Sequence, residues 1–144
     1  MELLPNRLGG GAPVVDVRVR PEPDERKRLS GPALRTFFRI AAAWQLTVVE
    51  QRALLGWPAA STYHKYKAGD HAALSFDTLT RLSLIFGIYK SLQVLYPEER
   101  FADGWVRMPN TNVLFNGAPP LTLMIDGAID GLYKVRRLLD ARRG

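Results

Sequence analysis

The sequence contains no cysteine among its 144 residues. This absence excludes a disulfide framework, catalysis by a thiol and zinc sites built from thiolates, and it is compatible with a reducing compartment. Histidine is also scarce, because His64 and His71 are the only two in the chain. Without cysteine partners they are better interpreted as solvent-facing or phosphate-contacting residues than as metal ligands. We therefore expect neither a metal site nor a cofactor.

Long apolar runs are missing as well. No segment approaches the roughly 18 to 20 apolar residues that span a bilayer, and the N-terminus lacks the basic start and apolar core of a secretion signal. A glycine-rich phosphate loop after a strand and a serine in a nucleophile elbow are also missing, since the GGGAP at residues 9–13 lacks the flanking elements. These absences favour a cytoplasmic protein that is not an enzyme and has no membrane contact.

What the sequence does have is positive charge and enough apolar residues for a core. Twenty Lys and Arg against fourteen Asp and Glu give a net charge of +6, and 47% of the residues are hydrophobic. The isoelectric point is about 10.0. Such a balance is typical of a globular protein whose partner is phosphate, an anionic membrane or an acidic protein.

The first 29 residues predict a flexible N-terminal arm. They are rich in Gly, Pro and charge, as in RPEPDERKR at residues 20–28, and they have little to bury. VVDVRV at residues 14–19 could form a short strand that pairs with a partner. We expect order to begin at Ser30, which can cap a helix whose first turn holds Pro32.

Apolar spacing after this arm predicts an all-α fold. A first helix reaches Trp44, and TVVE at residues 47–50 is a capping box that opens a second helix ending near Leu55. A third helix covers residues 61–68 and stops at Gly69. Helix, glycine turn and helix form a helix-turn-helix-like unit, in which Trp44 and Trp57 are expected in the core.

The predicted third helix is the candidate DNA-binding element. Residues 56–69 include two lysines and a histidine and no acidic residue. Recognition helices enter the major groove by their N-terminal turns, where small polar side chains reach phosphates or base edges. The residues expected to contact DNA are Ser61, Thr62, His64, Lys65 and Lys67. A solvated surface helix, with its tyrosines packed inward and its charges hydrated, is the alternative.

The remaining sequence predicts one long helix and a second domain. Ser75 should cap a helix that is interrupted at Gly87 and resumes to Leu95, with an apolar stripe for the core or a dimer face. We place a domain boundary near Pro97, which gives a domain at 30–97 and another at 98–144. The latter holds a short helix, turns, and a broken helical segment at 121–143. Its arginine-rich end is either an ordinary helix C-terminus or an arm for another protein's anion site.

The order of motifs resembles a known family. After the helix-turn-helix-like unit come IYKSLQVLYP, GWVRMPNTNVLFNG and PPLTLMIDGAIDGLYKVRRLL. This order resembles the Xre, MbcA and ParS antitoxins, specifically the Xre-type antitoxins encoded beside RES-domain toxins. The resemblance covers residues 29–143, and its most specific positions are Trp105, Pro109, Asn110, Asn112, Phe115, Gly117, Pro120, Leu121, Gly127, Val135 and Leu138.

The resemblance implies two activities. The C-terminal domain would bind an NAD-degrading RES toxin and cover its active site, and the N-terminal domain would dimerise and bind operator DNA to autoregulate the operon. Asp140 and the terminal carboxylate could satisfy a cationic cleft, or the arginines could pair with acidic groups at its rim. The residues expected to contact the toxin are Trp105, Asn110, Asn112, Phe115, Leu121, Arg136, Asp140, Arg142, Arg143 and Gly144.

Two other functions fit the same sequence. A stand-alone helix-turn-helix transcription regulator could use its C-terminal half to sense a small ligand or to dimerise. An enzyme of unknown activity is the third alternative. A RES-domain gene beside this one would favour the antitoxin, and the absence of such a gene would favour the regulator.

Overall fold

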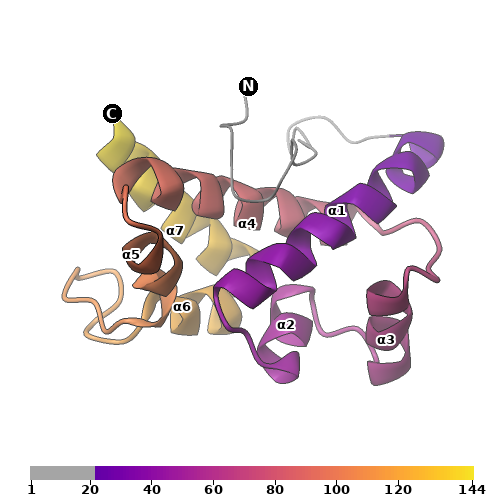
Figure 1. Cartoon of the computed structure of the whole chain (residues 1–144), viewed down its shortest axis with the longest axis horizontal. Coiled ribbons are helices and arrows are strands. Elements are labelled where there is room, and N and C mark those ends of the chain that lie inside the picture. The colour runs from indigo at the N-terminus through magenta and orange to yellow at the C-terminus, as the bar shows by residue number, and fades with distance from the viewer. Residues whose placement is uncertain (1–21) are drawn as a thin grey trace.

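The computed structural model describes residues 22–144, and over this range the protein is entirely helical (Figure 1). The all-α prediction is therefore confirmed, whereas the strand expected at residues 14–19 lies outside the described residues. The elements are α1 (Pro23–Ala43), α2 (Val48–Leu54), α3 (Ala60–Ala68), α4 (Phe76–Leu95), α5 (Glu99–Gly104), the 3-10 helix η1 (Trp105–Arg107), α6 (Pro120–Asp126) and α7 (Ala128–Arg143).

Helix α1 begins earlier than the sequence suggested, which corrects the end of the expected arm. Pro23 occupies the first helical position, where its missing N–H costs nothing, and acidic Asp24 follows in the first turn. Ser30 is no cap: it is fully buried inside α1, where its Oγ donates to the Arg26 carbonyl at 2.5 Å. The same Oγ accepts from the Leu74 amide at 2.9 Å and thus joins α1 to the segment before α4.

The local signals of α2, α3 and the start of α4 were predicted correctly. The Thr47 side chain accepts from the Glu50 amide, and the Glu50 carboxylate accepts from the Thr47 amide, so the capping box is complete. Helix α3 ends at Gly69, whose φ of 82° is the left-handed conformation that glycine adopts without strain. Ser75 caps α4 by accepting from the Thr78 amide.

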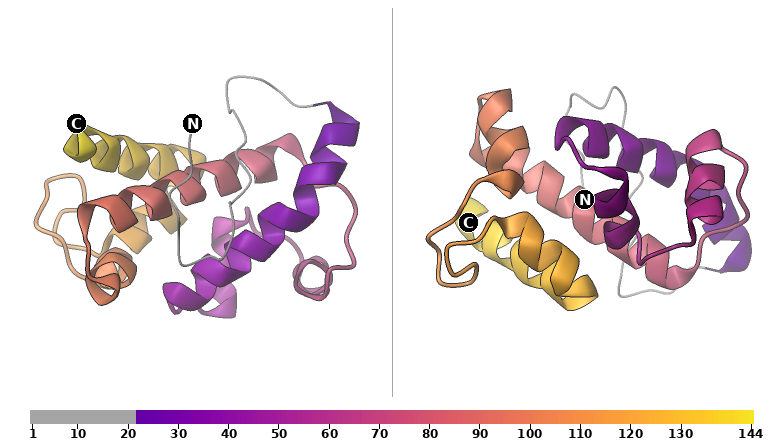
Figure 2. Two further views of the ribbon diagram at one scale, coloured as in Figure 1. Left: turned by 45° about the horizontal axis from the view of Figure 1, so that its top comes forward. Right: turned by 90° about the horizontal axis from the view of Figure 1, so that it is seen from below.

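Helix α4 is the central element, and it runs without interruption through Gly87. The expected break there is wrong, because this glycine serves a close approach between helices. A Cβ at Gly87 would lie 2.5 Å from Cζ and Nε of Arg136 on α7. The missing side chain leaves the space in which the Arg136 guanidinium packs, so α7 lies alongside α4 (Figure 2).

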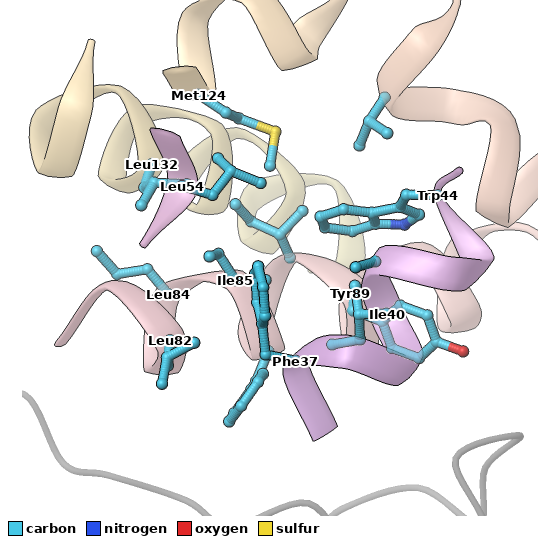
Figure 3. Packing of buried hydrophobic residues seen from close by; sticks show 14 of the residues in the cluster. Phe37, Ile40, Trp44, Leu54, Leu82, Leu84, Ile85, Tyr89, Met124 and Leu132 are labelled. Atoms are coloured by element: carbon cyan, nitrogen blue, oxygen red, sulfur yellow. The ribbon is translucent and has the colours of Figure 1, made fainter. Parts of the chain in front are cut away.

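One hydrophobic core includes residues from α1 to α7. Figure 3 shows Phe37 of α1, Leu54 of α2, Ile85 of α4, Met124 of α6 and Leu132 of α7 within this cluster. Of the two roles expected for the apolar stripe of α4, core or dimer face, the structure shows the core. Of the two tryptophans predicted for the core, Trp44 is 1% exposed. Trp57 contradicts the prediction, with 56% of its surface exposed.

The helices that the structure describes include none with the length and apolar character required to cross a membrane.

Candidate functional site

Polar contacts fasten the turn between α2 and α3. The Tyr63 hydroxyl donates to Gln51 Oε1 at 2.6 Å, and Gln51 Nε2 donates to the Leu46 carbonyl at 3.0 Å. Arg52 Nε donates to the Pro58 carbonyl at 3.0 Å and so closes the turn itself. These contacts fix the orientation of α3 relative to α2, which a helix-turn-helix requires for docking.

Helix α3 presents one face to the protein and the other to solvent. Tyr63 is 1% exposed, and its ring centre lies 6.0 Å from that of Phe38 on α1. Burial raises the pKa of Tyr63 and of the half-buried Tyr66 above the ordinary value of tyrosine. Of the residues expected to contact DNA, Thr62 is half-buried, and the exposed ones are Ser61, His64, Lys65 and Lys67.

The segment that forms this face and the turn before it carries no negative side chain. No acidic residue occurs from Gln51 to Gly69. The Lys67 ammonium lies 5.9 Å from the centre of the Phe38 ring, which places its charge where α3 meets α1. The arrangement therefore brings all five expected DNA-binding residues onto one nine-residue helix, with Lys65 and Lys67 in its last turn.

Several residues expected to contact the toxin are instead part of the core. The exposed fractions of Trp105, Phe115 and Leu121 are 8%, 4% and 5%. The rings of Trp105 and Phe115 meet edge to face with their centres 5.8 Å apart. Because these rings are buried, they would not contact the toxin directly. They would support the shape of the surface that does.

Asn110 and Asn112 build the loop that follows η1. Asn110 Oδ1 accepts from the Asn112 amide, and Asn112 Oδ1 accepts from the Leu114 amide, each at 2.9 Å. The Asn110 main chain also pairs with the other end of the loop, because its N–H donates to Ala118 and its carbonyl accepts from Gly117. This loop has no regular secondary structure, and the two asparagine side chains supply hydrogen bonds to its main-chain amides instead.

The arginine-rich end of α7 is tied to α4. Arg136 Nη1 lies 3.5 Å from the Ser83 carbonyl and its Nε lies 3.6 Å from Asp140 Oδ2. The buried Ser91 hydroxyl donates to Asp140 Oδ1 at 3.2 Å and accepts from Arg143 Nη1 at 3.3 Å. The last two expected toxin residues, Arg142 and Gly144, are exposed at the helix end.

Exposed apolar residues near the loop were missed by sequence reasoning. Val113 is 93% exposed, Met108 is 63% exposed, and Phe101 on α5 is 54% exposed. Periodicity cannot find such residues, because Met108 and Val113 lie in a segment without helical spacing. Large apolar side chains left in water are typical of binding surfaces when they gather in one region.

Arg107 connects the C-terminal segment to the helix-turn-helix. Its Nε donates to the Trp44 carbonyl and its Nη2 to the Gln45 carbonyl, both at 2.7 Å. Its Nη2 also pairs with Glu50 Oε1, the carboxylate oxygen that completes the capping box of α2. One partly buried guanidinium thus contacts the end of α1 and the start of α2.

Within residues 22–144 the structure holds no group of three or more His, Asp or Glu side chains arranged to bind a metal ion.

Comparisons with known proteins agree with this arrangement. The model of the antitoxin Xre-like helix-turn-helix domain matches residues 25–87, and that of the antitoxin Xre/MbcA/ParS C-terminal toxin-binding domain matches residues 91–144. The uncharacterized protein y4oB of Sinorhizobium fredii is 44% identical over 111 residues, which are 77% of this chain and 84% of that protein. The chain belongs to the Xre/MbcA/ParS antitoxin family. No solved structure matches it significantly.

The antitoxin therefore has a helix-turn-helix domain of DNA-binding type and a toxin-binding domain, as the resemblance implied. Residues 88–90, between the two matched segments, lie within α4. Both domains consequently share one helix and one core. The division expected near Pro97 stays a prediction.

Proposed function

We propose that this antitoxin neutralises an NAD-degrading RES-domain toxin by covering its active site, and that as a homodimer it binds the operator of its own operon. The observation that carries the proposal is the combination in one chain of an exposed cationic helix, α3, with a segment that matches the toxin-binding domain. The antitoxin itself would use no cofactor and catalyse no reaction. It would act in the cytoplasm, where its operator and toxin occur.

The proposed DNA interface is the outer face of α3. Ser61 and Thr62 lie at the N-terminal turn, which in helix-turn-helix proteins approaches base edges. Lys65 and Lys67 follow on the next turn and would neutralise phosphates. A homodimer would place two copies of α3 in successive major grooves, about 34 to 36 Å apart, which predicts an operator with two related half-sites.

The proposed toxin interface combines the loop after η1 with the end of α7. Met108 and Val113 supply exposed apolar surface of the kind that anchors protein interfaces. Arg142, exposed at the end of α7, supplies positive charge. Both parts lie in the segment that matches the toxin-binding domain. A stand-alone transcription regulator, the alternative function, would need no surface for binding a toxin.

Co-expression with the RES toxin of the same operon tests neutralisation. The wild-type antitoxin should restore growth and cellular NAD. Val113→Asp should weaken rescue, because a charge on an apolar anchor must be desolvated on binding. Val49→Asp is the matched control, since Val49 is 60% exposed on α2 and lies in the other domain. Rescue that is absent even with the wild type, or equal loss in both variants, would contradict the proposal.

Salt-dependent binding to promoter DNA tests the second activity. The double variant Lys65→Ala/Lys67→Ala should bind more weakly, and the slope of log affinity against log salt should fall by about 0.9 per lost phosphate contact. Lys134→Ala/Arg137→Ala removes the same charge from α7, a helix of the segment that matches the toxin-binding domain, which lies apart from α3 (Figure 1). If both double variants behave alike, α3 is not the DNA-binding element.

A further inference from the structure

Trp57 is an exposed aromatic residue in a strained conformation. Its φ of 63° lies in the left-handed region, which bulky side chains rarely adopt. Its exposed fraction of 56% contrasts with 1% for Trp44 and 8% for Trp105. Strained residues of this kind are concentrated at functional sites, where the surrounding structure holds them in place.

The turn around Trp57 is held from both sides. The Trp57 amide donates to the Arg52 carbonyl at 2.7 Å, and the Arg52 side chain binds the Pro58 carbonyl. On the other side, the Arg81 side chain lies against Gly56, where a Cβ would be 3.0 Å from Arg81 Nε. The backbone of the turn is therefore fixed, and with it the position from which the exposed indole projects.

This place is directly before the recognition-type helix. Trp57 stands three residues ahead of Ala60, where α3 begins. A helix-turn-helix brings that end of the helix to the DNA, so a residue in the preceding turn meets the edge of the same groove. In the sequence no acidic residue occurs from Gln51 to Gly69. The Asp77 carboxylate is paired with Arg81, the side chain that lies against Gly56.

We propose that Trp57 is an uncharged DNA-contacting residue of the antitoxin. Its ring packs on the sugar-phosphate backbone at the groove edge, and its Nε1–H, which can only donate, binds a phosphate oxygen. The inference rests on the proposed binding of operator DNA and adds to it a contact that contributes affinity without neutralising charge. A second copy of the chain is the other possible occupant of this indole, and the experiments below separate the two.

Intrinsic fluorescence of the full-length antitoxin gives the first test. Because the other two tryptophans are buried, Trp57 should dominate the solvent-sensitive emission and its quenching by acrylamide. Operator DNA should change the emission and reduce the quenching, and the Trp57→Phe variant should lose this response. A response that appears on raising the protein concentration without DNA, and does not change when DNA is added, would assign the indole to a dimer interface and overturn the proposal.

Binding of labelled operator DNA gives the second test. Trp57→Ala should weaken binding roughly tenfold, as loss of an aromatic anchor does, while the salt slope stays that of the wild type. Trp57→Phe should recover part of the loss, and Val49→Ala is the control for an exposed apolar residue on α2. If wild-type protein does not bind the operator, the proposed function fails. If it binds and Trp57→Ala binds equally well, only the present inference fails.

Discussion

Helices α3 and α7 both carry several basic side chains but use them in opposite ways. On α3, His64 and Lys65 project into solvent while Tyr63 holds the helix to the protein. On α7, the Arg136 guanidinium packs on α4, and Arg143 binds a buried serine of that helix. Cationic residues in a sequence can therefore be exposed to solvent on one helix and packed against the protein on another.

The difference follows from what each helix packs against. Helix α3 has nine residues and one buried side chain, Tyr63, so most of its surface stays available. Helix α7 buries Leu132, Val135 and Leu139 against the rest of the core, and two of its basic residues, Arg136 and Arg143, contact α4 beside that face. We expect variants of α7 to act first on stability, and variants of the α3 surface to act first on DNA binding.

The largest effect should come from Gly131, where α7 approaches α6. A Cβ at this position would lie 2.2 Å from the Leu123 carbonyl oxygen, a backbone atom that cannot move aside. Gly131→Ala should lower the free energy of unfolding by about 3 kcal/mol, the upper range for overpacking. Gly104→Ala is the matched control, because no atom lies within 4 Å of the added methyl group. Urea unfolding that gives equal stabilities would show that α7 is not tightly packed.

A smaller effect is expected at Arg107, which links the two regions. Arg107→Ala removes hydrogen bonds to two carbonyl groups and to the Glu50 carboxylate, and should cost about 2 kcal/mol. Arg100→Ala, which breaks an exposed pair with Glu98, should cost less than about 0.5 kcal/mol. Thermal unfolding of the two variants and of the wild type measures both losses of stability. If Arg107→Ala also lowers operator affinity while α3 is unchanged in sequence, the linkage orients the helix-turn-helix.

The variant Tyr63→Phe tests whether the hydrogen bond from Tyr63 to Gln51 holds α3 against α2. Tyr63→Phe leaves the Gln51 amide oxygen without its buried donor and should cost about 1 to 2 kcal/mol. Tyr66→Phe is the control, since the Tyr66 ring contacts His71 and its removed hydroxyl belongs to a half-buried side chain. The larger loss should belong to Tyr63→Phe, together with weaker DNA binding. Equal losses would mean that the hydrogen bond does not hold α3.

The same tyrosine predicts a pH dependence. Burial raises the pKa of Tyr63 in the folded protein above the value near 10 of an unfolded tyrosine. Its contribution to stability is therefore complete below about pH 10 and is lost as the pH rises through the folded pKa. Unfolding measured between neutral and strongly alkaline pH should show a steeper decline for the wild type than for Tyr63→Phe. Parallel curves would exclude Tyr63 as the cause.

Local signals explain what could be predicted from the sequence. Thr47 and Glu50 at capping-box spacing, Gly69 after a helix and Ser75 before one each act within a few residues, and the structure shows all of them. The start of α1 was missed because proline and charge suggested disorder, although Pro23 followed by acidic residues is also a pattern for a helix N-terminus.

The remaining errors concern contacts between distant segments. Gly87 looked like a helix break because its partner, Arg136, is 49 residues away and only packing reveals it. Trp57 was expected in the core because tryptophan is usually largely buried, whereas its exposure depends on how the turn is held. For the toxin site, sequence could not separate the buried Phe115 from the exposed Val113, which lie two residues apart.

The smallest effect on stability is expected from removing residues 140–144, and this change decides what the end of α7 does. The deletion removes five exposed residues. Two of them, Asp140 and Arg143, contact the Ser91 hydroxyl, and water can replace these contacts, so the loss should stay below about 1 kcal/mol. Toxin binding should persist if the loop around Val113 supplies the anchors. Inhibition of NAD consumption should fall if the tail enters the cleft.

Inhibition is measured as NAD consumption by the purified toxin in the presence of the shortened antitoxin. Size-exclusion chromatography shows whether the complex of the two proteins persists. Ser91→Ala is the control, because it releases Asp140 and Arg143 from α4 but leaves the tail present. Recovered NAD consumption in an intact complex with the shortened chain, together with full inhibition by Ser91→Ala, would identify the tail as a plug. Full inhibition by both would mean that the body of the domain covers the cleft, and that the polar residues after Leu139 serve only to finish the helix.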